Sequence, residues 1–232
     1  MFVHRGKERT LSHNKRIASL LSFIAGIVNV TGFISVQRLT TNVTGHFAFF
    51  VDEIFKLHFE QSFIYFLYIL FFFLGSFVSS LLVETVSRKK EKFVFIIPAI
   101  IESMILFSVA FAGHSVITDN ADIISCSLLF AMGLQNSLVT QISDAMVRTT
   151  HLTGLFTDLG IELSQLFFYK ERKHREKLIT TIKLRGRIIA FFFIGGIAGG
   201  ILYSYLGLHT LGIPAAILIT ALLYDVRKVM KP

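Results

Sequence analysis

The feature that most limits how this chain folds is a pattern of four landmarks that occurs twice, in the same order. The first copy contains Gly26-x-x-Asn29, Asn42-Val43-Thr44-Gly45, the run Phe71–Ser80 and Ile97-Pro98-Ala99. The second copy contains Gly133-x-x-Asn136, His151-Leu152-Thr153-Gly154, the run Phe191–Gly200 and Ile213-Pro214-Ala215. Duplicated membrane halves usually place a small-molecule or ion pathway at their interface. The repeat therefore predicts an architecture and a location for function.

The composition is that of a polytopic membrane protein. Hydrophobic residues make up 53% of the 232 positions, and charge is confined to short blocks between apolar runs. The net charge of +8 does not indicate nucleic-acid binding, because the basic residues lie where cytoplasmic loops are expected. The single cysteine, Cys126, excludes an intrachain disulfide and a cysteine-based metal site, and no cofactor is predicted.

Six apolar stretches are long enough to cross about 30 Å of hydrocarbon as helices. They are Ile17–Val36, Ser62–Val86, Phe93–Gly113, Ala121–Ile142, Ile188–Leu206 and the short Leu208–Tyr224. Two further apolar segments, Val43–Leu57 and Leu152–Phe168, are shorter and carry acidic residues. Whether these two segments cross the membrane decides the topology.

The positions of Lys and Arg indicate that neither short segment crosses. Basic residues cluster at both termini, at 88–92 and in Lys170–Arg187, whereas the connections Gly113–Ala121 and Leu206–Thr210 contain neither Lys nor Arg. With six spans, every basic cluster falls in the cytoplasm and both uncharged connections fall outside. The expected protein is an all-α protein of the bacterial inner membrane with six transmembrane helices and cytoplasmic termini.

This topology also predicts how the copies are related. Each repeat has three spans, and an odd number inverts the second copy about an axis in the membrane plane. The expected organisation is a basic cytoplasmic tail (1–16), a first repeat (17–113), an external connection (114–120), a second repeat (121–226) with a cytoplasmic basic loop (169–187), and a cytoplasmic C-terminus (227–232). The short segment of each repeat either re-enters the membrane, which requires a protein or water surrounding, or lies on its surface.

Stripes of small residues predict close helix contacts, because small side chains let helix backbones approach each other. One stripe contains Gly195, Gly196, Gly199 and Gly200, and it is echoed by Gly75, Ser76, Ser79 and Ser80. Two interpretations remain open. Either these two related helices cross one another at the centre, or Gly195, Gly196, Gly199 and Gly200 form a homodimer contact.

Polar residues within or beside the spans are candidates for a substrate pathway, because such groups are costly in a membrane. Glu102 is the clearest ionisable candidate, and a neutral, hydrogen-bonded carboxyl is its structural alternative. Asp158 shares a helix face with Glu162; in a pathway both would bind cations or relay protons, whereas on a surface helix both would be solvated. The other candidates are Asn29, Asn42, Thr44, Gly45, His46, Gln135, Asn136, Arg148, Thr150, His151, Thr153 and Gly154.

At these residues the sequence resembles the YoaK-like family of bacterial inner-membrane proteins, whose function is unknown. The matching features are Gly26-x-x-Asn29-x-x-Gly32-Phe33 with Asn42-x-Thr44-Gly45, and Gly133-x-Gln135-Asn136 with Arg148-Thr149-Thr150-His151-Leu152-Thr153-Gly154-x-x-Thr157-Asp158-x-Gly160. The resemblance covers nearly all of the chain from Ala18 onward. It implies a multi-spanning inner-membrane protein without an established substrate.

Three functions are compatible with this pattern. The repeat and the intramembrane polar residues favour a transporter or channel for a small solute or ion. A membrane-embedded enzyme is disfavoured, because the chain contains no HExxH, GxSxG or Walker-type loop. The alternative is a non-transporting assembly or sensory protein, in which Lys170–Arg187 would bind anionic lipid or a cytoplasmic partner.

Overall fold

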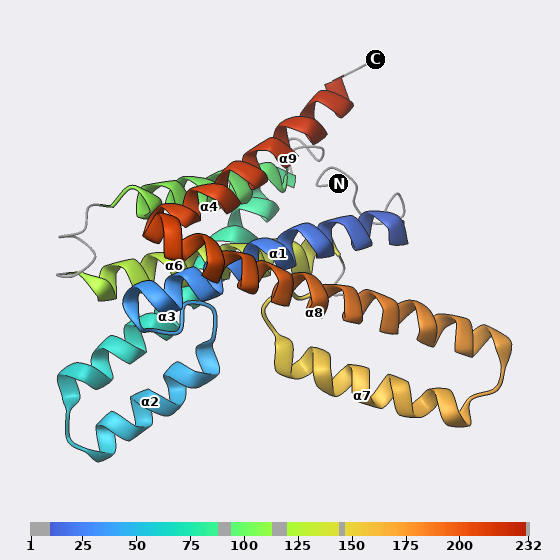
Figure 1. Cartoon of the computed structure of the whole chain (residues 1–232), viewed down its shortest axis with the longest axis horizontal. Coiled ribbons are helices and arrows are strands. Elements are labelled where there is room, and N and C mark those ends of the chain that lie inside the picture. Colours follow the sequence, from blue (N-terminus) through green and yellow to red (C-terminus); the bar gives the residue numbers. More distant parts are fainter. Residues whose placement is uncertain (1–9, 88–93, 113–119, 144–146, 231–232) are drawn as a thin grey trace.

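The computed structural model (Figure 1) describes residues 10–87, 94–112, 120–143 and 147–230. Within these ranges the regular structure is entirely helical, so the predicted all-α class is confirmed. In chain order the elements are α1 (Leu11–Val36), α2 (Val43–Phe55), α3 (Phe59–Ser87), α4 (Ile96–Ala110), α6 (Ala121–Ile142), α7 (Leu152–Phe168), α8 (Arg172–Leu206), the 3-10 turn η3 (Gly207–Leu211) and α9 (Gly212–Met230).

Several of these helices have the length and composition of membrane spans. Four stretches of the described residues qualify: Ser12–Val36, Phe59–Ser87, Ala121–Ile142 and Arg172–Arg227, the last of which contains α8, η3 and most of α9. Helix α4 has 15 residues, so its length of about 22 Å falls short of a hydrocarbon core of about 30 Å. The helices indicate a membrane protein, whereas the number of six spans and their orientation stay predictions.

The segment 169–187, expected to connect two spans in the cytoplasm, is helical from Arg172 onward, while its side of the membrane stays a prediction. The stretch is rich in Arg, Lys, Glu and Leu, which favour helix, and Arg172 pairs with Glu176 one turn later at 3.1 Å. Helix α1 likewise begins inside the predicted tail, because the Thr10 hydroxyl caps it by accepting a hydrogen bond from the His13 amide. The basic cluster at 88–92 lies outside the described residues.

Helices α1 and α8 cross with their backbones in contact, and they run side by side in Figure 1. A Cβ atom at Gly26 would lie 2.1 Å from the carbonyl oxygen of Phe192, and one at Gly195 would lie 2.2 Å from the carbonyl oxygen of Phe23. Both distances are far below van der Waals contact. These two positions therefore accept only glycine unless a backbone moves.

Helices α3 and α6 cross in the same way. A Cβ atom at Gly75 would lie 2.1 Å from the carbonyl oxygen of Phe130, and one at Gly133 would lie 2.2 Å from that of Phe72. The Ser76 hydroxyl adds a hydrogen bond of 3.1 Å to the Gly133 carbonyl across this crossing. The glycines of these two crossings occupy matching landmarks of the two copies.

The prediction that the two small-residue stripes cross one another is therefore wrong. The stripe of α3 packs against α6, and the stripe of α8 packs against α1, so each meets the first helix of the other copy. Gly195 and Gly199 both contact α1 within one chain. A homodimer contact through the stripe of α8 stays a prediction.

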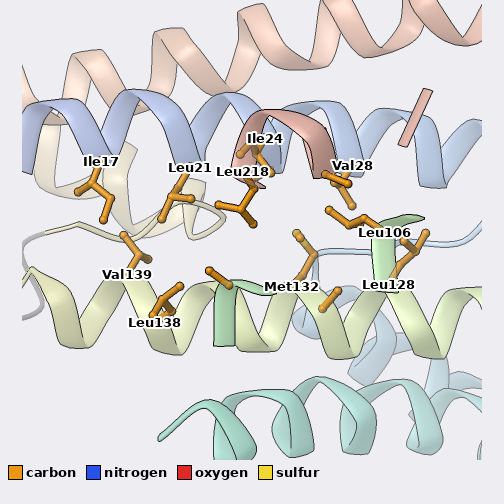
Figure 2. Close-up of a cluster of buried hydrophobic side chains, with 14 of the residues drawn as sticks. Ile17, Leu21, Ile24, Val28, Leu106, Leu128, Met132, Leu138, Val139 and Leu218 are labelled. Carbon is orange, nitrogen blue, oxygen red and sulfur yellow. The ribbon is translucent and has the colours of Figure 1, made fainter. Parts of the chain in front are cut away.

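An apolar cluster fills the space between α1, α4, α6 and α9 (Figure 2). We call its middle part the central apolar layer; it consists of the fully buried residues Ile24, Val28, Leu106, Met132 and Leu218. Two helical hairpins, α2 with α3 and α7 with α8, extend from the packed centre (Figure 1). They expose large apolar side chains, including Phe55 at 83% and Phe168 at 81%, as is typical of surfaces that meet lipid or a partner.

Candidate functional site

The first polar cluster joins the end of α1 to the turn that follows it. Helix α1 ends at Gln37, whose left-handed φ of 53° redirects the chain. The Thr41 hydroxyl then donates a hydrogen bond of 2.6 Å to the Asn29 side-chain oxygen. Asn42 begins α2 by accepting a hydrogen bond of 3.0 Å from the Gly45 amide. This sequence of turn and cap holds the amide of Asn29 in place.

The second polar cluster pairs the matching asparagine and threonine at the end of α6, with the asparagine as the donor. The Asn136 side-chain amide donates to the Thr150 hydroxyl at 2.7 Å. Beside it, the buried Gln135 amide donates at 3.1 Å both to the Thr149 hydroxyl and to the Leu21 carbonyl of α1. The cluster therefore ties α6 to its own turn and to the first helix of the other half.

Matched residues are hydrogen-bonded to each other in both clusters, with the threonine donating in the first and the asparagine in the second. Asn29 and Asn136 close the Gly-x-x-Asn landmarks, and Thr41 and Thr150 each stand three residues before a Thr-Gly pair. Asn29 and Asn136 were both predicted as candidates, and so was Thr150. Thr41 was missed, although its position relative to Thr44 is the signal that would have identified it.

The two clusters do not meet in one site. Leu21 of α1 lies beside Gln135, and Gly32 lies beside Leu128, so α1 and α6 run antiparallel. Asn29 comes eight residues after Leu21, which corresponds to about 12 Å along the axis of α1. Within this interval of α1 lie the fully buried Ile24 and Val28 of the central apolar layer.

A third group joins residues from different halves of the chain, and its assembly was not predicted for that reason. The Tyr68 hydroxyl of α3 donates to the Asp122 carboxylate of α6, and Arg38 Nε lies 4.0 Å from the same carboxylate. The His46 ring lies 4.7 Å from the Tyr68 ring, and His46 Nε2 lies 2.5 Å from the Leu39 carbonyl oxygen. Because a carbonyl only accepts, Nε2 carries the proton.

His46 of α2 is the one predicted candidate in this third group. Its side chain is buried, and this burial lowers the pKa of the imidazole, so the ring is neutral at neutral pH. A neutral ring packed on tyrosine holds α2 against α3. It also places a hydrogen-bonding group close to the ion pair between the halves.

Glu102 lies in the middle of the buried stripe of α4 and is fully buried. Neither of its carboxyl oxygens has a hydrogen-bond partner among the described residues. The neighbouring Ser103 hydroxyl is occupied by the Ala99 carbonyl at 2.8 Å. The structural alternative for Glu102, a neutral carboxyl with a hydrogen-bond partner, is therefore not found among the described residues.

Other predicted candidates lie apart from these clusters. Thr44, Arg148 and Thr153 are exposed. A Cβ atom at Gly154 would lie 2.8 Å from the exposed His151 ring, and one at Gly45 would lie 2.4 Å from a methyl group of Leu39. The two glycines therefore let the chain turn tightly at the starts of α7 and α2.

Asp158 and Glu162 bind one arginine of the neighbouring helix. Arg185 of α8 makes a 3.0 Å contact with Asp158 and also pairs with Glu162, so the two carboxylates share one partner. This arrangement holds the α7–α8 hairpin together. Asp158 and Glu162 lie on one face of α7 as predicted, and the cation that they bind is the Arg185 side chain.

Replacing Arg185 with Gln is expected to destabilise the α7–α8 hairpin by about 1 kcal/mol, because it leaves two carboxylates facing each other without a cation. Limited proteolysis of the purified protein should then cut between α7 and α8 several times faster. The matched control is Arg172→Gln, which breaks only an exposed pair with Glu176. Equal protection of both variants would contradict a structural role for Arg185.

Within the described residues, no group of three or more His, Cys, Asp or Glu side chains is placed to hold a metal ion. The arrangement instead offers uncharged hydrogen-bonding groups in two separate clusters and one isolated buried carboxyl. Such groups recognise polar solutes or protons.

The chain belongs to a family described as Protein of unknown function (DUF1275), whose family model matches residues 17–224. No curated protein and no solved structure matches the chain. Membership in this family agrees with the expected uncharacterised family and supplies no activity. Function is therefore argued from the residues themselves.

Proposed function

We propose that this protein is a transporter or channel for a small solute or ion, with a pathway between two inverted three-helix repeats. The observation that carries the proposal is the matched Asn–Thr contact in both halves, Asn29 with Thr41 and Asn136 with Thr150. Along α1, Ile24 and Val28 of the central apolar layer stand between Asn29 and Leu21, which is bonded to Gln135 beside Asn136. In alternating access, a path between the repeats opens to one side of the membrane at a time, and an apolar layer between two polar groups would form the closed barrier.

The packing of the helices supports the repeat on which this proposal depends. Gly26 and Gly133 occupy matching landmarks, and each meets the glycine-containing helix of the other copy. Two equivalent crossings allow the halves to exchange roles, one being closed while the other is open. The proposal includes six spans, cytoplasmic termini, a bacterial inner-membrane location and a YoaK-like relationship, and it assigns no catalytic residue.

The side chains of the clusters indicate the kind of solute. Asn, Gln and Thr offer hydrogen-bond donors and acceptors without net charge. Within each cluster they already bond to one another, so a solute must exchange bonds with them rather than meet a bare charge. We therefore expect a small polar solute that both donates and accepts hydrogen bonds.

Flux measurements in proteoliposomes test the proposal. Wild type is expected to move at least one member of a panel of labelled sugars, amino acids, polyols and monovalent ions. Asn29→Ala and Asn136→Ala should each slow that flux by about tenfold, because each removes a hydrogen bond worth roughly 1–3 kcal/mol in a partly buried site. Gln141→Ala is the matched control, since the Gln141 side-chain amide donates a hydrogen bond to Ser137 of its own helix.

An absence of flux across the panel, together with the absence of any thermal shift on adding its members, would contradict a transport function. A flux that survives both Asn substitutions unchanged would contradict the assigned role of Asn29 and Asn136 in the pathway.

A non-transporting assembly or sensory protein is the second candidate, and the α7–α8 hairpin favours it. Helix α7 exposes Phe156, Phe167 and Phe168, and the first turns of α8 carry Arg172, Lys173 and Arg175. An apolar face beside a basic segment suits a membrane surface or an acidic partner. Neutralising Arg172, Lys173 and Arg175 should weaken binding to anionic vesicles if this role is correct. An unchanged flux in the same variant would show that this binding is separate from transport.

A further inference from the structure

The buried stripe of α4 contains one group that a purely structural helix does not need. The stripe consists of Pro98, Ala99, Glu102, Ser103, Leu106, Val109 and Ala110. Glu102 is central in it, one turn from Leu106 of the central apolar layer, and its exposure is 0%. A residue of leucine size would fill such a position without a polar cost, as Leu218 does at the matching position of the second copy.

The surroundings of Glu102 determine which charge state fits. A carboxylate without a hydrogen-bond donor or a cation is strongly disfavoured inside a protein, whereas a neutral carboxyl is tolerated. Both oxygens of Glu102 lack such a partner among the described residues. The titratable or charged residues whose side chains are described on the helices that pack against α4 are Glu60, Tyr65, Tyr68 and Glu84 on α3, Asp122 and Cys126 on α6, His209 in η3, and Tyr224, Asp225 and Arg227 on α9. None of them is a hydrogen-bond partner of Glu102.

We propose that Glu102 is the proton-binding site that couples transport to a proton gradient; this inference rests on the proposed function. In the closed arrangement the carboxyl is neutral and holds one proton. When α4 separates from the helices packed against it, the O–H bond breaks and the proton passes to water, leaving a carboxylate. The closed arrangement returns only after a proton from water on either side rebinds to that oxygen.

A proton suits this position better than a metal ion or another cation. Monovalent and divalent cations require several oxygen ligands, and Ca²⁺ takes six to eight. Glu102 supplies one carboxyl group, the hydroxyl of the adjacent residue Ser103 is bonded to its own helix, and no group of three or more His, Cys, Asp or Glu placed to hold a metal is found in the described part of the chain. A proton needs one oxygen only.

Infrared spectroscopy tests the charge state without any solute. Near neutral pH, the wild-type protein in lipid should show the carbonyl stretching band of a protonated carboxyl, and Glu102→Gln should lose it. Glu84→Gln makes the same change at an exposed residue of α3 and should keep the band. If the Gln variant fails to fold, Glu102→Leu takes its place, because Leu occupies the matching position 218. A wild-type spectrum from which Glu102→Gln subtracts nothing would overturn the proposal.

Flux under an imposed pH gradient tests the coupling, using the panel members that wild type transports. A gradient of one pH unit should sustain an about tenfold accumulation in wild type if one proton moves per solute. Glu102→Gln should move the same solutes down their own gradients while losing this accumulation. Wild-type flux that ignores the pH gradient would overturn coupling and leave the transport function standing. An absence of flux from every protein would overturn both.

Discussion

A single methyl group at Gly195 is expected to lower the stability of this protein by about 3 kcal/mol. The Cβ atom of Gly195→Ala would lie 2.2 Å from the carbonyl oxygen of Phe23, so α1 and α8 must move apart. Backbone atoms cannot rotate away as a side chain does, which places the change at the upper end of the usual cost of overpacking. The free energy of unfolding in mild detergent, titrated with a denaturing detergent, measures the effect.

The matched control lies nine residues earlier on the same helix. A Cβ atom at Gly186 meets nothing within 4 Å, so Gly186→Ala should be neutral or should stabilise α8 by up to about 1 kcal/mol through helix propensity. Gly75→Ala should repeat the loss, because its Cβ would lie 2.1 Å from the Phe130 carbonyl oxygen in the other crossing. Similar stabilities for Gly195→Ala and Gly186→Ala would show that α1 and α8 do not cross as described.

The second large effect is expected at Gln135. Its buried amide donates to the Thr149 hydroxyl and to the Leu21 carbonyl, and Thr149 is itself fully buried. Gln135→Leu removes both bonds and leaves polar atoms of its partners with fewer contacts in a site that water does not reach. The expected loss of stability is about 1–3 kcal/mol, measured by the same detergent titration.

The same substitution elsewhere on α6 separates this loss from a general effect of leucine. Gln141 is only partly buried and bonds to Ser137 of its own helix, so Gln141→Leu should change stability by less than about 0.5 kcal/mol. If Gln135→Leu is as stable as Gln141→Leu, the bond to Leu21 does not hold the two halves together. A double-mutant cycle of Gln135→Leu with Thr149→Val should then measure the coupling between these two side chains, separately from the bond to Leu21.

Local sequence pattern was most informative about the helices themselves. The predicted segments Ala121–Ile142 and Leu152–Phe168 coincide with α6 and α7, because apolar content and flanking polar residues mark helix ends locally. The predicted span begins at Ile188, whereas helix α8 begins at Arg172. Hydropathy marks only the apolar part of a helix, and helix propensity continues through the charged residues before it.

Sequence pattern predicted those residues of the candidate site that are unusual within their own helix, and it missed those that are not. Asn29 and Asn136 stand out as amides within apolar helices, and the repeat pairs them. Tyr68 and Asp122 gave no such signal: each is ordinary in its own helix, and their hydrogen bond joins residues 54 positions apart. Asp158 was proposed for a pathway, yet Arg185, 27 positions later, is its partner.

The sequence alone determined that this chain forms apolar helices in two copies of one pattern, with glycine at the places where backbones meet. Such information lies within single helices and their periodicity. Only the tertiary structure decided that the stripe of α8 meets α1, that Gln135 reaches Leu21, 114 positions away, and that Glu102 has no hydrogen-bond partner within the described ranges. The physical reason is that burial and hydrogen-bond pairing depend on both of the surfaces that meet. The residues of one helix specify only its own surface and not the surface that packs against it.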